Sequence, residues 1–217
     1  MPGAERDGEG DLRRLTAEYI AVAQQHAQQK RENGLLFAKG FNDQILLRDG
    51  QLERWLNYLK DNPRRLLMKR EKPDLFRVRR GLTFAGLSFS AIGNRFLLER
   101  PLKIQVQCSR SLSDEEITER VEYFLSQAKK GAVLVSPAIS KGEKAVMRAA
   151  MNARLPLIFI EENGLTPYTR PGGEFFEACA QGKLLILAPW EHHNERLLIT
   201  RDKCLAMNQM AKEITNL

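Results

Sequence analysis

Apolar and polar residues follow a regular pattern in the second half of this chain and a weaker one in the first. After about residue 100, short apolar runs alternate with segments whose apolar residues recur every three or four positions, as in buried strands and amphipathic helices. These segments predict strands at 104–108, 132–135, 157–160 and 184–187, and helices after Ser113 and at 141–153, 173–180 and 201–214. Strands that alternate with helices form parallel sheets with helices on both faces. We therefore expect an α/β protein whose residues 101–217 form a three-layer, Rossmann-like domain.

The first hundred residues predict a smaller, mostly helical module. Residues 1–33 have the composition of a partly disordered leader followed by a helix from about 12 to 31. Residues 34–80 predict a basic helical module, and residues 81–100 predict a hairpin or linker.

Within the basic module, the pattern predicts an extended segment at 41–47 and a helix at 51–60. The apolar stripe of this helix consists of Leu52, Trp55, Leu56 and Leu59. We expect Asn62-Pro63 to end the helix, because the residue before a proline avoids the α conformation.

Composition limits the class of protein. With 217 residues, of which 43% are hydrophobic, the chain can bury one sizeable core. No apolar run approaches the roughly 18 residues of a membrane span, and the first residues lack the apolar stretch of a secretory signal. The three cysteines show no C-x-x-C spacing, which argues against a disulfide framework and against a structural zinc site. We expect a cytoplasmic protein that has no membrane partner.

Positive charge is concentrated in one short part of the chain. The sequence carries a net charge of +7, and residues 60–80 contain nine Lys or Arg against three acidic residues. A solvated helix face would also explain such a run, but its clustering and the aromatic residues among the charges favour contact with a nucleic acid. The expected phosphate contacts here are Arg64, Arg65, Lys69 and Arg70. Trp55 and Tyr58 are candidate stacking partners.

Two predicted joints between a strand and the next helix have the composition of phosphate-binding turns. At the carboxyl edge of a parallel sheet, helix N-termini offer free N–H groups to anions. The first joint follows the strand at 104–108, and the second runs from residue 136 to residue 143, with capping-box spacing in both helices that follow. The candidate phosphate-binding residues are Ser109, Arg110, Ser136, Ser140 and Lys141. Ordinary helix capping and loop turning is the alternative explanation.

Several motifs follow one another in order between about 104 and 210. They are Cys108-Ser-Arg110, the run VLVSPAISKGEKAVMRAAMNARLPLIFI at 133–160, Glu162-Asn-Gly-Leu165 with Tyr168, and Gly182-Lys-Leu-Leu-Ile186. In this order they resemble the motifs of the DNA-processing protein family (DprA/Smf). The resemblance implies a Rossmann-like domain that binds single-stranded DNA in a basic pocket.

A second ordered set of residues lies in the N-terminal half. Residues 41–48 read FNDQILLR, and GQLERWLNYLKDNPRR follows at 50–65. This order is similar to the closing part of REP-associated tyrosine transposases, over about 35–70. The resemblance implies that Tyr58 is the nucleophile of a covalent 5′-phosphotyrosine link to DNA, a reaction that needs a divalent metal such as Mg²⁺. That family holds its metal with a His-hydrophobic-His motif, which this sequence lacks, so we expect a catalytically incomplete transposase without a bound metal or other cofactor.

The sequence supports two alternative functional interpretations. The first is a DNA-binding protein of mobile-element origin, with a homodimer as its candidate assembly, that binds single-stranded rather than duplex DNA through its basic helical segment and its Rossmann-like pocket. The alternative is a small-nucleotide-processing enzyme, because Pro171-Gly-Gly-Glu174 with Glu177 resembles a motif of lysine-decarboxylase-like nucleotide phosphoribohydrolases. In such an enzyme, Glu174 or Glu177 would be the acid/base at the carboxyl edge of the sheet. The absence of that motif's Gly-Thr pair and the concentrated basic segment both favour DNA binding.

Overall fold

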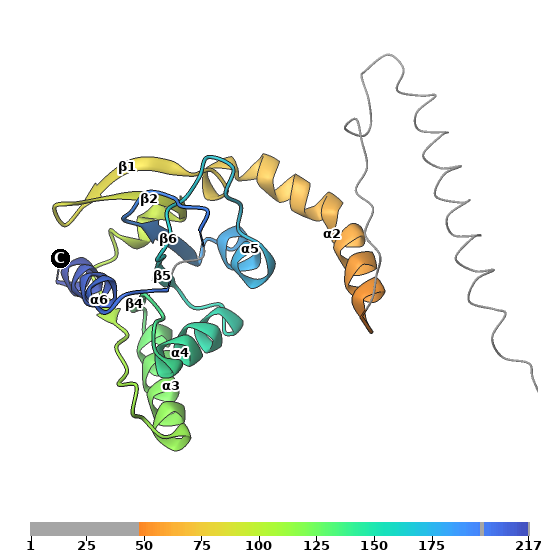
Figure 1. The fold of residues 1–217 in the computed structure, drawn as a ribbon. Coiled ribbons are helices and arrows are strands. Elements are labelled where there is room, and N and C mark those ends of the chain that lie inside the picture. Colours follow the sequence, from red (N-terminus) through yellow and green to blue (C-terminus); the bar gives the residue numbers. More distant parts are fainter. Residues whose placement is uncertain (1–47, 196–197, 217) are drawn as a thin grey trace, which may run out of the picture. The chain divides into compact units, whose positions relative to one another are not determined.

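The computed structural model describes residues 48–195 and 198–216 (Figure 1). The chain divides into two compact units, Met1–Trp55 and Leu56–Leu217. In the first unit, the described residues form a turn at Asp49-Gly50 and the start of a helix. The helix predicted at 12–31 and the extended segment predicted at 41–47 lie outside the described residues.

The second unit is built on a six-stranded sheet. Its strands are β1 (Arg79–Phe84), β2 (Leu87–Gly93), β3 (Lys103–Gln105), β4 (Val133–Ser136), β5 (Leu157–Ile160) and β6 (Leu184–Ala188). Their order across the sheet is β1-β2-β6-β5-β4-β3. β3 to β6 are parallel, whereas β2 runs antiparallel to both β1 and β6. Because the four parallel strands are neighbours in chain order, their carboxyl ends form one continuous edge.

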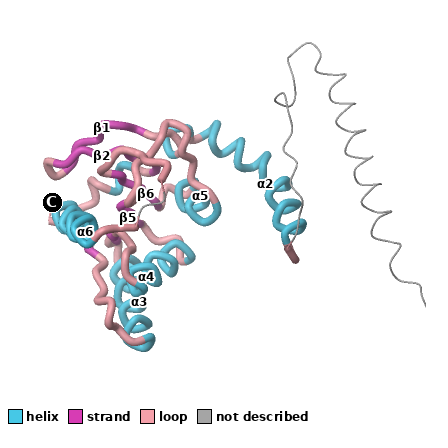
Figure 2. Tube along the Cα trace, viewed as in Figure 1, coloured by secondary structure: helices cyan, strands magenta, loops and turns pink. Residues whose placement is uncertain are grey.

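Helices cover both faces of this sheet (Figures 1 and 2). The described helices are α2 (Gln51–Glu71), α3 (Asp114–Lys129), α4 (Lys141–Asn152), α5 (Gly173–Ala180) and α6 (Arg201–Thr215), with the 3₁₀ helices η1 (Pro73–Leu75) and η2 (Arg95–Leu97). α3, α4 and α5 cover one face of the sheet and α6 covers the other, whereas α2 has no buried residue. One core contains Phe124 of α3, Val146 of α4 and Phe176 of α5, and a second core contains Met207 of α6. This arrangement confirms the predicted three-layer, Rossmann-like α/β fold. None of the helices in the described part of the chain is long and apolar enough to cross a membrane.

The predicted capping boxes are confirmed at the starts of α3 and α4. The side chains of Ser113 and Ser140 accept hydrogen bonds from the backbone N–H groups of Glu116 and Glu143, and each glutamate side chain accepts one from the N–H of its serine. Each box therefore satisfies two N–H groups that an α-helix leaves without a partner at its start.

The helix predicted at 51–60 is longer than expected. Asn62-Pro63 does not end it, because α2 continues through Pro63 to Glu71. A proline inside a helix removes a backbone hydrogen bond and costs about 3 kcal/mol. Asp61 bridges the proline by ion pairs with Arg64 and Arg65, whose hydrogen bonds lower the pKa of Asp61 to about 2. Both arginines also contact α5, so tertiary contacts hold the helix together where the isolated sequence predicts an end.

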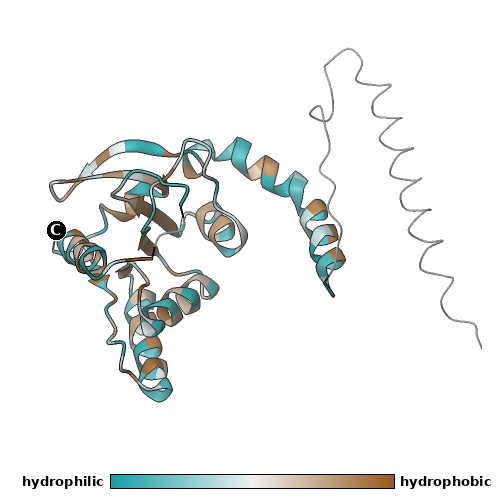
Figure 3. Cartoon of the chain, in the orientation of Figure 1, coloured by the Kyte–Doolittle hydropathy of each residue, from teal (hydrophilic) through white to brown (hydrophobic). Residues whose placement is uncertain are grey.

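The segment predicted as a hairpin or linker at 81–100 contains β2 and most of β1, which belong to the same sheet. β2 pairs with β6 from Ser90 opposite Ala188 to Gly93 opposite Leu185. Gly93 permits this pairing, since a Cβ there would lie 2.2 Å from the carbonyl oxygen of Leu184. β1 is an edge strand that begins with hydrophilic residues, whereas the central strands are hydrophobic (Figure 3). The segment predicted as a hairpin or linker therefore adds two strands to the domain.

Candidate functional site

The carboxyl edge of the parallel strands brings the two predicted phosphate-binding joints together. The backbone N–H of Cys108, which follows β3, donates to the carboxylate of Glu143 in α4 across 3.3 Å. Ser136, at the end of β4, is fully buried, and its hydroxyl donates to the carbonyl oxygen of Val106. The same hydroxyl accepts a hydrogen bond from the N–H of Ala138. The two joints are therefore neighbours, and the Ser136 hydroxyl serves to connect them.

The carboxylate of Glu143 occupies the turn between β4 and α4. This residue is only 2% exposed, and it accepts hydrogen bonds from the N–H groups of Cys108, Ile139 and Ser140 at 3.3, 2.7 and 3.2 Å. The hydroxyl of Ser140 is also engaged, because it accepts from the N–H of Glu143. Burial raises the pKa of the Cys108 thiol, and the negative charge of Glu143 raises it further, to a smaller extent. The donors that would hold a phosphate in this turn are bound to a carboxylate of the chain itself.

The other predicted residues at this edge contact neighbouring parts of the chain. Lys141 forms an ion pair with Asp114 at the start of α3, and Ser109 shares a 2.8 Å hydrogen bond with the hydroxyl of Ser111. A guanidinium N–H of Arg110 lies 3.8 Å from the sulfur of Cys204 in α6. These side chains are exposed, but they surround a turn whose own donors are already satisfied.

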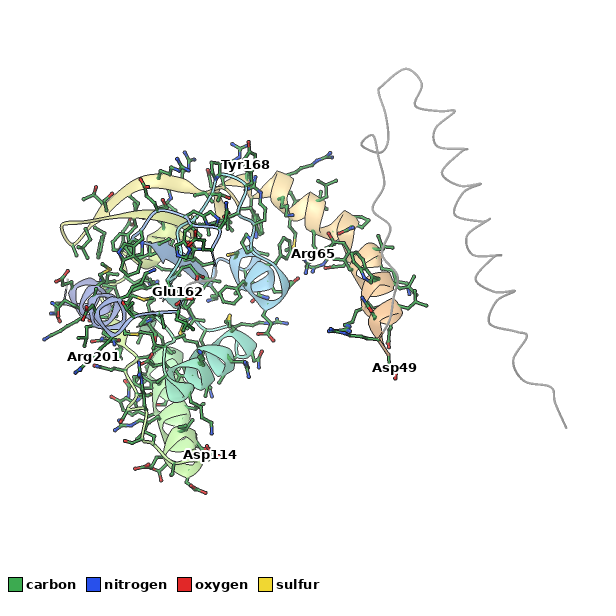
Figure 4. All side chains as sticks on the ribbon, viewed as in Figure 1. Asp49, Arg65, Asp114, Glu162, Tyr168 and Arg201 are labelled. Carbon is green, nitrogen blue, oxygen red and sulfur yellow. The ribbon has the colours of Figure 1, made fainter. Side chains whose placement is uncertain are left out.

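Three of the four predicted basic residues of α2 hold this helix against α5. Arg64 forms an ion pair with Glu177 of α5. Arg65 lies between α2 and α5, with its guanidinium carbon 4.5 Å from the ring centroid of Phe176 (Figure 4). The Nζ atom of Lys69 lies 5.6 Å from the same centroid. Cations over an aromatic face are attracted by its negative charge density, so these side chains stabilise the docking of α2.

An arginine cluster surrounds Asp74 at the start of the edge strand β1. We give this name to Arg77, Arg79 and Arg95, all of which are exposed. Arg79 forms a 2.7 Å ion pair with Asp74, and this hydrogen bond, together with the charges of Arg95 and Arg77, lowers the pKa of the Asp74 carboxyl. Three positive charges therefore face one negative charge. Arg95 was missed by sequence reasoning because it lies outside the basic segment, and the β1–β2 hairpin brings it back to residue 79.

A cleft of about 430 Å³ lies where β6 ends, beside the β1–β2 hairpin. Its polar and aromatic lining includes Arg80, Ser88, Thr166, Trp190, Glu191 and His192. The loops after β5 and β6 form part of its wall and are bound to each other. Asn163 donates to the carbonyl of His193 and accepts from its N–H, and Nδ1 of His192 lies 3.0 Å from the carbonyl oxygen of Gly164. The cleft was not predicted, because its lining comes from segments that are far apart in the sequence.

Replacing Gly164 with alanine is expected to destabilise the protein by about 1–3 kcal/mol, because the new Cβ has no room. It would lie 2.1 Å from the backbone nitrogen of His192 and 2.2 Å from the carbonyl carbon of Glu191, so the two loops must separate. Thermal unfolding of the variant measures the loss. Gly172→Ala is the control, since a Cβ at Gly172 meets no atom within 4 Å and should change the melting temperature little. Equal melting temperatures for the two variants would contradict the tight loop contact.

The structure places the candidate catalytic residues Tyr58, Glu174 and Glu177 on α2 and α5. Tyr58 is half-exposed on α2, where the guanidinium carbon of Arg65 lies 6.0 Å from its ring centroid. Glu174 and Glu177 line a pocket of about 240 Å³ with the end of α4. That end of α4 leads into the amino end of β5, so the two glutamates do not lie at the carboxyl edge, where the enzyme alternative needs them. Within the described residues, no three His, Cys, Asp or Glu side chains are grouped as metal ligands.

The fold defines an α/β protein with a Rossmann-like parallel sheet that an antiparallel hairpin extends. No model of a known family matches the sequence, and no curated protein matches it either. Among solved structures, the chain is similar to DNA processing protein A from Helicobacter pylori, with a TM-score of 0.49 and 17% sequence identity. The alignment covers 65% of this chain and 66% of that one, just under two thirds, and that structure was solved for its single-stranded DNA binding mode. These comparisons give no support to the transposase resemblance.

Proposed function

We propose that this protein binds the backbone of nucleic acid, single-stranded DNA in preference to duplex, through the arginine cluster. The observation that carries the proposal is the group of three exposed guanidinium groups, Arg77, Arg79 and Arg95, around the single carboxylate of Asp74. Guanidinium groups bind phosphate oxygens through paired N–H donors, and exposed ones need little desolvation to do so.

Two further arginines of the basic segment are exposed. Arg70 is exposed at the end of α2, Arg80 is exposed in β1, and neither forms an ion pair with a described residue. A single strand also exposes unpaired bases, and the cleft beside β6 contains the indole of Trp190. The proposal therefore includes a preference for single strands.

Binding is expected to depend steeply on salt, because phosphate contacts release counterions from the DNA. Three contacts with a single strand give a slope of about −2 in a plot of log affinity against log salt, or about a twentyfold loss between 50 and 200 mM. Fluorescence anisotropy with a labelled 15-nucleotide strand and with the matching duplex measures both affinities at each salt concentration. An affinity for the single strand that does not change with salt would overturn the proposal.

We also propose that the protein acts by binding DNA and not by cleaving it. Its mobile-element origin is an additional hypothesis, which rests on the residues at 41–65 alone. The sequence lacks the His-hydrophobic-His motif that would hold a catalytic metal for Tyr58, and its only histidines are His26, His192 and His193. We expect no denaturant-resistant protein–DNA adduct after incubation with Mg²⁺ and a single strand. An adduct that forms with the native chain and is lost in Tyr58→Phe would contradict this expectation.

A further inference from the structure

The cleft beside β6 has walls that are fixed before any ligand binds. The loops after β5 and β6 are connected by the hydrogen bonds of Asn163 and His192, and Gly164 lets their backbones approach closely. The opposite wall is the β1–β2 hairpin, which is paired with β6 through four residue pairs. A volume of about 430 Å³ is within the range of small-ligand sites.

The aromatic group of this cleft is Trp190, which directly follows β6 and Pro189. Its ring packs partly against the core that contains Met207 of α6, and the Nζ atom of Lys203 lies 4.7 Å from the ring centroid. These contacts fix the orientation of the indole while it lines the cleft. A fixed aromatic ring in a polar cleft is suited to stack on a planar, polar ligand, and nucleobases are such ligands.

The polar groups around Trp190 match the parts of a nucleotide. The guanidinium of Arg80 can bind a phosphate, and the hydroxyls of Ser88, Ser90 and Thr166 can bind sugar or base oxygens. Glu191 also lines the cleft, and its carboxylate accepts hydrogen bonds only. A carboxylate pairs with the exocyclic amino group of cytosine and repels a phosphate, so the phosphate belongs at Arg80 and the base near Glu191.

We propose that this cleft binds one nucleotide of a single strand, with its base, cytosine in particular, stacked on Trp190 and its phosphate at Arg80. The inference rests on the proposed function, which it makes more specific. Arg80 lies directly after Arg79 of the arginine cluster in β1, so one strand of the sheet supplies both a backbone contact and a residue of the cleft. Because successive side chains of a strand point to opposite faces and β1 is an edge strand, a single strand bound at the arginine cluster would reach the cleft by passing around the exposed edge of β1.

The intrinsic fluorescence of Trp190 tests this inference directly. The chain contains two tryptophans, so Trp55→Phe leaves Trp190 as the only one. In this variant, a 15-mer of deoxycytidylate is expected to quench the emission in proportion to the protein bound, because a stacked base quenches an indole. An abasic 15-mer with the same number of phosphates should bind with a similar salt dependence and leave the emission unchanged.

Substitutions test the same site by affinity. Trp190→Leu, which keeps an apolar side chain against the core, should weaken binding of the deoxycytidylate 15-mer by about tenfold and leave abasic binding unchanged. Arg80→Gln should lower the salt slope by about 0.7 for a single strand. Arg148→Gln, on an exposed position of α4, is the matched control and should change neither.

The outcomes separate this inference from the proposed function. Salt-dependent binding of the deoxycytidylate strand without quenching of Trp190 would overturn the cleft inference and leave the proposed function intact. Quenching by free deoxycytidine monophosphate without any binding of the strand would overturn the proposed function. It would also overturn the inference that the cleft binds a nucleotide of a single strand. Equal quenching by the deoxycytidylate strand and by the abasic strand would show that base stacking does not cause the quenching.

Discussion

Replacing Arg77, Arg79 and Arg95 with glutamine is expected to weaken binding of a single strand by about a hundredfold at 50 mM salt and to reduce the salt slope by about 2. Each arginine that contacts a phosphate releases a fraction of a counterion, and glutamine releases none. The three residues share one carboxylate, Asp74, so the cluster has positive charge available for an external anion. Anisotropy titrations at several salt concentrations measure both quantities.

A control must remove the same charge elsewhere on the domain. Arg120, Lys129 and Arg148 are exposed on α3 and α4, and their joint replacement with glutamine lowers the net charge by the same amount. If binding depends on contacts at the cluster, this control keeps most of the affinity. Equal losses in the two triple variants would show that only overall charge matters. In that case Arg79 of β1 would be one of the charges that keep an exposed edge strand from pairing with other chains.

The parallel part of the fold could be predicted from sequence because its signals are local. The strand at Leu157–Ile160 and the helix at Gly173–Ala180 have the predicted bounds, and both predicted capping boxes form. Apolar runs, serine caps and terminal glycines act over a few residues, so they can be read without knowing the rest of the chain. The extension of α2 through Pro63 could not be predicted from sequence, because it depends on contacts with α5, more than a hundred residues away.

The candidate sites also include features that local signals predict and features that depend on long-range contacts. The two βα joints were located correctly from their spacing, but the sequence does not show that Glu143 satisfies their donors, because a capping glutamate can be exposed or buried. Glu116 is the exposed case and Glu143 the buried one. The arginine cluster and the cleft depend on how the β1–β2 hairpin pairs with β6. Their residues Arg95 and Trp190 carry no motif of their own, so only the folded chain brings them to their partners.

Replacing Glu143 with alanine is expected to lower the free energy of unfolding by about 3–5 kcal/mol, because it leaves buried N–H groups without an acceptor. The affected groups belong to Cys108, Ile139 and Ser140. Glu116→Ala removes the equivalent glutamate from the exposed capping box of α3 and should cost about 1 kcal/mol or less, since water replaces the lost bond. Urea unfolding followed by circular dichroism gives both values, and Glu143→Gln, which keeps the shape and one acceptor oxygen, should lie between them.

The same variant tests whether Glu143 takes the place of a bound anion. With the carboxylate gone, two N–H groups at the start of α4 and that of Cys108 after β3 are free to hold a phosphate, and a ligand that binds only the folded state raises its stability. Inorganic phosphate should therefore raise the melting temperature of Glu143→Ala clearly more than that of the native chain or of Glu116→Ala. Those two chains correct for the general stabilisation that phosphate gives to folded proteins. An equal rise in all three would mean that the turn has no capacity for an anion even when its carboxylate is removed, and that Glu143 serves only to join β3, β4 and α4.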